Sequence, residues 1–343
     1  MKNTKPIIVA EISGNHNQSL TRALKLVDAA AEAGADAVKL QTFKPETMTL
    51  NLNKGEFVLK QKGVEGRWKN KTLFNIFKEA QTPWEWHKAI INRAKKKKIK
   101  CFSTPFDETA VDFLEKFNMP FYKIASAENI HYPLIRKLAK TRKPLIISTG
   151  MINIKELDDT ISFVKKLGCK DLTILKCTTS YPASPKESNI LTIPYLRKRY
   201  KCKVGISDHT MGIGVSIAAV AQGACMVEKH ITLNRRDGGI DSFFSMEPNE
   251  MKTLVRECKI AHESLGKIQK TPVKSERKYL NYRRSIYVVK NINKGEKFTT
   301  KNISIIRPGL GLHPKYFEKI LNKKAKKNLK KGTATNWKLV TRS

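Results

Sequence analysis

Short apolar stretches alternate with longer amphipathic stretches along most of the chain, up to about residue 266. Each short stretch is almost continuously apolar and ends abruptly at polar residues. This pattern is typical of parallel strands that are buried on both faces. We therefore predict eight strands, at residues 5–11, 37–41, 99–103, 121–125, 144–148, 172–177, 203–207 and 224–230.

The amphipathic stretches between them have apolar residues at helical spacing. After Ser19, for example, Leu20, Ala23 and Val27 fall on one helical face, and Gly34 is placed to end that helix. A second helical stretch is interrupted where Pro83 suits a new helix start. Further helices are predicted at residues 73–97 (with that interruption), 108–117, 133–139, 155–167, 193–200, 213–222 and 249–266.

Eight strand–helix units of this total length predict an α/β fold, a (β/α)8 TIM barrel over residues 1–266. An open, doubly wound sheet is the alternative. It is less favoured because no GxGxxG motif opens the first helix. A long insertion, residues 42–71, separates the second strand from the helices that follow it.

The pattern changes after this region. Residues 267–284 are basic and polar and are predicted to form a linker. Short alternating stretches follow at residues 285–289 and 303–307, with turn residues between them. Residues 285–343 are predicted to form a small β-rich accessory domain, too small to hold a catalytic core of its own.

The formal net charge of +36 is extreme. Such a charge would attract nucleic acid, so a nucleic-acid-binding protein built on an inactive barrel is one alternative. However, only 15 of the 66 basic residues are arginine, and the lysines are spread along the chain without an aromatic and arginine groove. We therefore expect no nucleic-acid partner, and note that a basic field also suits a small anionic substrate.

The six cysteines occur singly and form no CxxC pair. This favours free thiols in a reducing cytoplasm over disulfides or a zinc site. No stretch approaches the about 20 apolar residues of a membrane span, and the first residues do not form a signal peptide. We expect a cytoplasmic protein with no membrane association.

Polar residues stand where the predicted strands end. In a barrel, the C-terminal strand ends and the loops that follow them form the active site. Single polar endings are ordinary, but eight would converge on one rim. These endings include Glu11, Lys39, Gln41, Thr104, Lys123, Ser126, Glu128, Ser148, Thr179, Tyr181, Ser207, His209 and His230.

Two of these endings are histidines, His209 and His230, after the seventh and eighth predicted strands. If those strands are neighbours, the two imidazoles can hold a divalent metal and leave other positions open. Taken singly, each histidine is better explained as a surface residue or a hydrogen-bonded core residue, and only the repeated pattern favours a metal site.

Lys39 and Lys123 lie inside strands, where the two-residue period can direct them into the barrel mouth. Buried lysines need an anionic partner or a lowered pKa, which points to a phosphate or carboxylate ligand. Pairing with barrel carboxylates and Schiff-base chemistry are the alternatives. Glu11 and Glu128 are candidates for metal or substrate contact and for a general base.

Several of these motifs, in this order, resemble the sialic acid synthase family. They are IVAEISGNHN (8–17), KLQT (39–42), FSTPF (102–106), YKIASAEN (122–129), ISTGM (147–151), KCTTSYP (176–182), GISDHT (205–210) and EKHIT (228–232). RPGLGL at residues 307–312 resembles that family's antifreeze-like (SAF) domain. The resemblance covers essentially the whole chain and implies the same barrel with a C-terminal SAF domain.

The resemblance implies an enzyme, a transferase that condenses phosphoenolpyruvate with an N-acetylated amino-sugar aldehyde and water. The products are a nine-carbon 2-keto acid and phosphate. The segments at residues 15–20, 39–43, 82–86 and 237–245 look most like the branch that uses 2,4-diacetamido-2,4,6-trideoxy-L-altrose, whose product serves carbohydrate biosynthesis such as flagellin glycosylation. The branches that use N-acetylmannosamine or the legionaminic acid precursor are the alternatives.

The resemblance also implies roles for individual residues. His209 and His230 would bind the metal, with Mn²⁺ expected and Mg²⁺ or Co²⁺ as alternatives, and this metal would polarise the sugar aldehyde. Phosphoenolpyruvate would contact Lys39, Thr104, Lys123, Ser126, Ser148 and Ser207, while Glu11, Gln41, Tyr181 and Asp241 would surround the sugar. Glu128 matches the proposed base.

Two further points follow from the resemblance. Arg307 matches an arginine that the accessory domain inserts into the barrel of a partner subunit, which implies a domain-swapped homodimer. Thr179 departs from the family pattern, because the sialic acid enzymes carry a phosphate-contacting asparagine there. A threonine keeps a hydroxyl, but its phosphate contact is in doubt.

Overall fold

The computed structural model describes residues 5–60 and 68–341, so residues 61–67 of the predicted insertion lie outside the described residues. The chain divides into two compact units, Met1–Gly266 and Lys267–Ser343.

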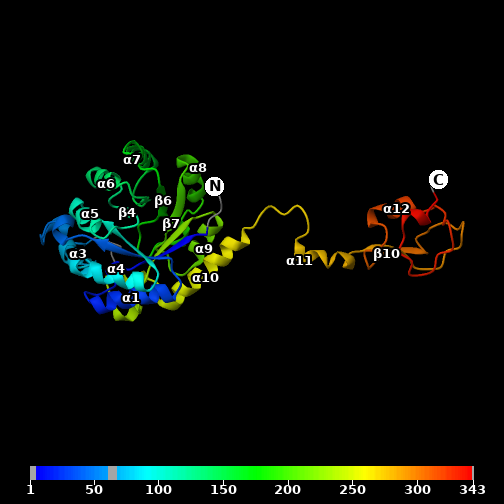
Figure 1. The fold of residues 1–343 in the computed structure, drawn as a ribbon, viewed down its shortest axis with the longest axis horizontal. Coiled ribbons are helices and arrows are strands. Elements are labelled where there is room, and N and C mark those ends of the chain that lie inside the picture. The colour runs from blue at the N-terminus through cyan, green and yellow to red at the C-terminus, as the bar shows by residue number, and fades with distance from the viewer. Residues whose placement is uncertain (1–4, 61–67, 342–343) are drawn as a thin grey trace. The chain divides into compact units, whose positions relative to one another are not determined.

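The first unit is a closed barrel of eight parallel strands in sequential order, with helices around it, as Figure 1 shows. This confirms the predicted barrel. Every strand pairs with the next one along the chain, and β1 closes the barrel against β8. The strands are β1 (Ile7–Glu11), β2 (Ala37–Thr42), β3 (Lys100–Pro105), β4 (Tyr122–Ile124), β5 (Leu145–Ser148), β6 (Leu172–Cys177), β7 (Lys203–Ser207) and β8 (Met226–His230).

The helices begin and end where local sequence provides caps. Ser19 accepts a hydrogen bond from the backbone N–H of Arg22 at the start of α1, and Asp107 caps α5 in the same manner. The predicted break near Pro83 separates α3 from α4. The longer helices are α1 (Leu20–Glu32), α3 (Leu73–Ala80), α4 (His87–Lys96), α5 (Glu108–Glu115), α6 (Tyr132–Lys140), α7 (Ile154–Lys166), α8 (Thr192–Tyr200), α9 (Gly214–Ala221) and α10 (Pro248–Ser264).

The insertion after β2 contains the short helix α2 (Pro45–Met48) and a 3₁₀ turn at Gly55–Phe57. Its last part, with Trp68, leads into α3. Within the described ranges, no helix is long and apolar enough to span a membrane.

The barrel has two apolar regions. The larger one fills the space between the outer faces of the strands and the helices. The smaller one fills the barrel interior, where one layer consists of Val9, Ala37, Phe102, Ile146, Leu175 and Met226. This buried interior layer forms the floor beneath the C-terminal strand ends.

The second unit contains the antiparallel pair β9 (Ser285–Val288) and β10 (Ile303–Ile306), close to the predicted stretches. Short helices α11 (Lys274–Arg277) and α12 (Phe317–Ile320) accompany them. Its own core includes Ile286, Val288, Phe298, Ile303 and Leu329. The antiparallel β-structure agrees with the predicted accessory domain.

Candidate active site

The polar residues at the barrel mouth lie two positions after the residues of the interior layer. Side chains in a strand alternate between faces, so residues two apart point to the same side. Continuing from the interior layer, each strand therefore places one polar side chain inward. These residues are Glu11, Lys39, Thr104, Ser148, Cys177 and Glu228, and Lys123 and Ser207 follow Phe121 and Gly205 in the same way.

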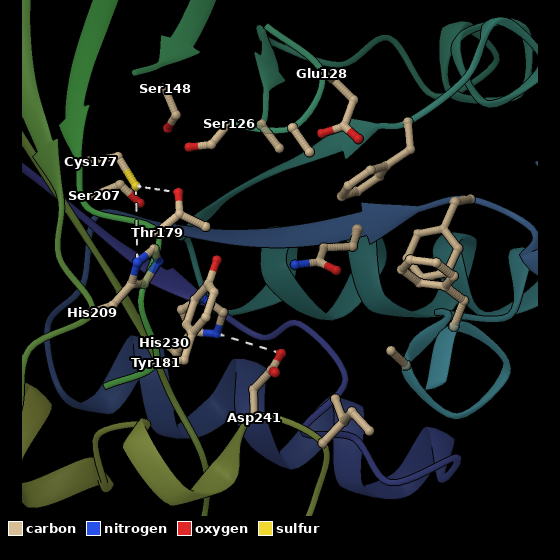
Figure 2. A pocket seen from close by; sticks show the side chains of 18 of the residues that line it. Ser126, Glu128, Ser148, Cys177, Thr179, Tyr181, Ser207, His209, His230 and Asp241 are labelled. Carbon is tan, nitrogen blue, oxygen red and sulfur yellow. Dashed lines mark hydrogen bonds and ion pairs between the residues drawn. The ribbon is translucent and has the colours of Figure 1, made fainter. Parts of the chain in front are cut away.

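A cavity of about 310 Å³ lies at these strand ends. It brings together most of the predicted site residues. Figure 2 shows Ser126, Ser148, Cys177 and Ser207 near one another, with His209, Tyr181 and His230 beside them and Glu128 across the pocket. The predicted residues that line the cavity are Lys39, Gln41, Lys123, Ser126, Glu128, Ser148, Thr179, Tyr181, Ser207, His209, His230 and Asp241.

Both lysines are buried and paired with carboxylates. The Lys39 Nζ lies 2.5 Å from Glu11 Oε2 and 3.8 Å from Glu228 Oε2. Lys123 donates to Glu228, which also accepts a 3.0 Å hydrogen bond from Ser207 Oγ. Burial alone would raise the pKa of Glu228, but the two lysines outweigh it and lower this pKa to about 2. The carboxylate pairing considered as an alternative is therefore present, and both lysines also face the cavity.

Glu11 and Thr104 do not line the cavity but lie behind Lys39. Thr104 Oγ1 accepts a hydrogen bond of 3.1 Å from Lys39 Nζ, and both Glu11 and Thr104 are fully buried. Together they hold the Lys39 amine in position. They would therefore influence a substrate indirectly, through Lys39.

His209 and His230 lie side by side, with ring centroids 5.4 Å apart. His209 Nδ1 donates to the backbone oxygen of Thr178 at 2.9 Å, so Nε2 is the ring nitrogen that can bind a metal when the ring is neutral. Burial lowers the pKa of His230 far below its usual value, so this imidazole is neutral. Its Nδ1 lies 3.9 Å from Asp241 Oδ2.

This donor set fits a divalent metal. The neutral His230, whose buried Nδ1 has no hydrogen-bond partner in the described chain, and the Nε2 of His209 are suitable metal ligands. The described residues contain no group of three or more His, Cys, Asp or Glu side chains arranged to hold a metal. A metal here would therefore have to take further ligands from solvent or substrate.

Glu128 stands on the loop after β4 and is 7 % exposed. Burial raises its pKa to about 7, which is the range suited to a general base near neutral pH. Its Oε2 and, across the cavity, Ser148 Oγ have no hydrogen-bond partner within the described residues. Buried polar atoms without partners in a cavity indicate a place for a ligand or water.

The remaining predicted residues shape the cavity wall. Ser126 Oγ accepts a 3.1 Å hydrogen bond from the Gly150 N–H, and a Cβ at Gly150 would lie 2.6 Å from that oxygen. Thr179 also crowds this glycine and lines the cavity. The ring of Tyr181 packs 4.5 Å from the ring of His209.

Glu228 and Cys177 are the site residues that the sequence analysis missed. Cys177 Sγ lies 4.0 Å from His209 Nδ1 and lines the cavity. Both residues lie two positions after an interior apolar residue. The strand period that identified Lys39 could have found Cys177, but it could not single out Glu228, because the polar residues Lys229 and His230 follow it directly.

A buried ion pair lies behind the two histidines. Lys229 Nζ lies 3.1 Å from Asp208 Oδ2 and donates to the backbone oxygen of Thr210 at 2.6 Å. Asp208 also accepts a 2.6 Å hydrogen bond from Ser216 Oγ of α9. Since Asp208 precedes His209 and Lys229 precedes His230, this pair joins the strand ends that carry both histidines.

The four segments associated with the sugar contact one another. Asn17 Nδ2 donates to the Gly238 oxygen at 2.9 Å, and Thr82 Oγ1 lies 3.5 Å from His16 Nε2. Trp84 Nε1 donates to the backbone oxygen of Phe43 at 3.3 Å. These four segments, the first and last of which lie more than 200 residues apart in the chain, thus form one framework on a side of the cavity.

Within this framework, Gly239 has a φ of +141°, and a Cβ there would lie 2.5 Å from Asn17 Oδ1. Both the backbone conformation and the lack of space require glycine. Asp241 follows two residues later and accepts a hydrogen bond from Ser13 Oγ. The double glycine therefore sets how Asp241 reaches the cavity.

Arg307 is an exposed residue of the second unit, immediately after β10. Its insertion into a partner's barrel stays a prediction.

Comparisons with known proteins identify the chain's relatives. The NeuB family model matches residues 26–270, and the SAF domain model matches residues 283–340. The chain is 41 % identical to a pseudaminic acid synthase of Helicobacter pylori, over 96 % of both chains. It is 38 % identical to an N,N'-diacetyllegionaminic acid synthase of Campylobacter jejuni, over 95 % of this chain and 97 % of that one.

Among solved structures, the chain is similar to N-acetylneuraminic acid synthetase from Leptospira borgpetersenii, crystallised with citrate. The TM-score is 0.72 and the identity 32 %, with 82 % of this chain and 92 % of that chain covered. These matches confirm the resemblance drawn from the motifs. The chain belongs to the NeuB family and carries a C-terminal SAF domain.

Proposed function

We propose that this protein condenses phosphoenolpyruvate with 2,4-diacetamido-2,4,6-trideoxy-L-altrose and water, giving pseudaminic acid and phosphate. It is an enzyme of the sugar-acid synthase type, and pseudaminic acid synthases share about 40 % of its sequence over nearly its full length. The observation that carries the proposal is the buried pair Lys39 and Lys123. It faces a cavity in which polar atoms of Ser148 and Glu128 have no hydrogen-bond partner among residues 5–60 and 68–341.

The lysines would bind the anionic groups of phosphoenolpyruvate. Lys39 is held charged, since its buried amine is surrounded by Glu11 and Glu228, whose effect exceeds that of burial and raises its pKa. The hydroxyls of Ser126, Ser148 and Ser207 would add hydrogen bonds to the same ligand. Fixed donors in a buried site stabilise charge on phosphate as its C–O bond breaks.

Enzymes of this family generally depend on a metal, and His209 and His230 would hold it here. When bound, the metal would polarise the sugar aldehyde as a Lewis acid. We expect Mn²⁺, with Mg²⁺ or Co²⁺ as alternatives. The chain's contribution is to keep His230 neutral by burial and to hold the His209 ring through its hydrogen bond to the Thr178 oxygen.

Glu128 would act as the general base. After the enol carbon of phosphoenolpyruvate attacks the aldehyde carbon, C2 becomes electron-poor. Glu128 would take a proton from the water that adds to C2, and phosphate would then leave by C–O cleavage. Gln41, Tyr181 and Asp241, which line the cavity, would orient the sugar.

We also propose that the SAF domain supplies Arg307 to a partner subunit in a domain-swapped homodimer, with residues 267–284 as the linker between it and the barrel domain. The match of residues 283–340 to the SAF model supports the presence of that domain. We place the enzyme in the cytoplasm, and its six free cysteines support a reducing compartment.

A legionaminic or N-acetylneuraminic acid synthase is the second candidate, since a diacetyllegionaminic acid synthase is 38 % identical to the chain. The two candidates differ only in the sugar that the cavity accepts.

Phosphate release measured with phosphoenolpyruvate, Mn²⁺ and each candidate sugar in turn tests the proposal. We expect turnover with the trideoxy-L-altrose derivative and loss of turnover with a chelator. Mn²⁺ binding measured by calorimetry should also be lost in a His209→Ala variant. Turnover only with N-acetylmannosamine or the legionaminic precursor would overturn the substrate assignment.

A further inference from the structure

One end of the cavity is apolar, although the proposed substrates are a sugar and a dianionic enol phosphate. Part of the cavity wall is formed by residues of the insertion, helix α3 and the loops after β3 and β8. We call this region the apolar end. It consists of Phe43, Met48, Trp68, Phe77, Phe106 and Ile240.

The apolar end is packed rather than loosely lined. Phe43 is 1 % exposed, and its ring makes edge contacts with Phe77 at 5.8 Å and Phe106 at 5.2 Å between centroids. Aromatic pairs in this geometry are favourable and hold one another in place. The shape of this end is therefore defined before a substrate arrives.

Trp68 joins the apolar end to the catalytic end. Its Nε1 donates to the backbone oxygen of Ile240 at 3.0 Å, so its polar group is already satisfied. Its ring packs 5.7 Å from that of Tyr181, which in turn packs against His209. A substrate whose aldehyde lies beside His209 would therefore extend along Tyr181 and Trp68 towards the apolar end.

Such a surface suits only part of a sugar. A hydroxyl placed against these side chains would lose its hydrogen bonds to water without gaining new ones, which is unfavourable. A methyl group placed there gains by leaving water. In a 6-deoxy sugar, the carbon at the end opposite the aldehyde is a methyl group, and it would reach this region first.

We infer that the apolar end binds the C6 methyl group of the sugar and thereby selects 6-deoxy substrates over 6-hydroxy substrates. This inference rests on the proposed function, since it takes the aldehyde to lie at the histidines. It identifies the insertion after β2 and helix α3 as specificity-determining elements that touch no group that reacts.

The size of the selection follows from general values for apolar pockets. A pocket of this kind discriminates against an added hydroxyl by about 100-fold in kcat/KM. We therefore expect the wild-type enzyme to prefer 2,4-diacetamido-2,4,6-trideoxy-L-altrose over its 6-hydroxy counterpart, 2,4-diacetamido-2,4-dideoxy-L-altrose, by about 10- to 100-fold.

The variant Phe77→Gln places an amide at the apolar end. It should raise KM for the 6-deoxy sugar about tenfold and bring the two sugars within a few-fold of each other in kcat/KM. Because the ring of Phe77 packs on Phe43 and Phe77 has no proposed role in the reaction, kcat for the 6-deoxy sugar should change little. The variant Phe77→Leu keeps an apolar side chain and should keep most of the preference.

Phe163→Gln is a matched control. Phe163 is also a partly buried phenylalanine on a helix, but it packs against Tyr132 on the outside of the barrel. Its substitution should leave the ratio between the two sugars unchanged. Thermal unfolding of each variant shows whether a lost activity is due to lost folding.

Turnover of the two sugars by the wild-type enzyme is sufficient to test whether 6-deoxy substrates are selected. Equal turnover of both sugars would overturn the inference and leave the proposed function intact. Turnover of neither sugar would overturn the proposed function and this inference with it. A preserved preference in a folded Phe77→Gln enzyme would show that another part of the cavity makes the selection.

Discussion

Replacing Glu128 by glutamine should remove the general base and, at alkaline pH, stabilise the folded protein. Burial raises the pKa of this carboxyl from its ordinary value of 4.5 to about 7. The folded state therefore binds the proton more tightly than the unfolded state does. Between these two pKa values the folded protein keeps the proton and the unfolded chain has lost it, so stability falls as pH rises through that range.

The loss of folding stability caused by the raised pKa of Glu128 is small below pH 4.5 and complete above pH 7. With 1.36 kcal/mol for each unit of pKa, the difference between 4.5 and about 7 amounts to about 3 kcal/mol. A glutamine has nearly the same shape and never ionises. Glu128→Gln should therefore raise the free energy of unfolding by up to about 3 kcal/mol at pH 8 and by little at pH 4.5.

Two assays check this reasoning. Denaturant unfolding of wild type and variant, followed at both pH values, measures the difference in stability. Steady-state kinetics should show that wild-type kcat/KM falls as pH drops below about 7, where the base becomes protonated. The variant should lose about 10²- to 10⁴-fold in kcat together with this acidic limb.

An equal change in stability at both pH values would refute the raised pKa of Glu128. An acidic limb that persists at the same pH in the variant would assign the titration to another group. Wild-type activity in a folded variant would remove Glu128 from the role of base.

Three further results are expected. Lys229→Met should cost about 3–5 kcal/mol in unfolding free energy because it leaves a buried carboxylate unpaired, whereas Lys203→Met, which breaks an exposed pair, should cost less than about 1 kcal/mol. Gly239→Ala should lower kcat/KM at least about tenfold by displacing the loop, whereas Gly214→Ala, where a Cβ meets nothing within 4 Å, should not. An Arg307→Ala chain mixed in equal amounts with a Glu128→Gln chain should recover about a quarter of wild-type activity, because about half of the dimers are mixed and one of their two sites is intact.

A specific result would contradict each of these three predictions. Equal costs for the two lysine substitutions, measured by denaturant unfolding, would mean that the buried pair adds nothing beyond a surface pair. Unchanged steady-state kinetics in the Gly239 variant would separate the double glycine from the sugar site. Mixed chains that form heterodimers without recovering phosphate release would exclude an arginine supplied by the partner.

Much of the site could be predicted because the barrel obeys a simple period. Strands buried on both faces must be apolar, so polar residues such as Lys39 and Lys123 stood out inside them. The two-residue alternation then directed both into one cavity. The stretch that became β4 was predicted at residues 121–125, and its regular pairing covers only Tyr122–Ile124.

The same period was not sufficient in β8. Glu228, Lys229 and His230 are three consecutive polar residues, and alternation alone leaves open which of them face the interior. The register of β8 with its neighbours decides that question, since Ser207 lies opposite Glu228 and Glu11 opposite His230. Lys229 then points outward and meets Asp208.

The sequence by itself determined the eight strand–helix units and the polar strand ends, because both depend on local burial patterns. Only the tertiary structure decided which carboxylate each lysine meets and that Trp68 of the insertion packs on Tyr181. Such contacts join residues far apart in the chain. Which residues meet depends on how the barrel closes and on how the insertion packs against it. Neither can be predicted from a local sequence pattern.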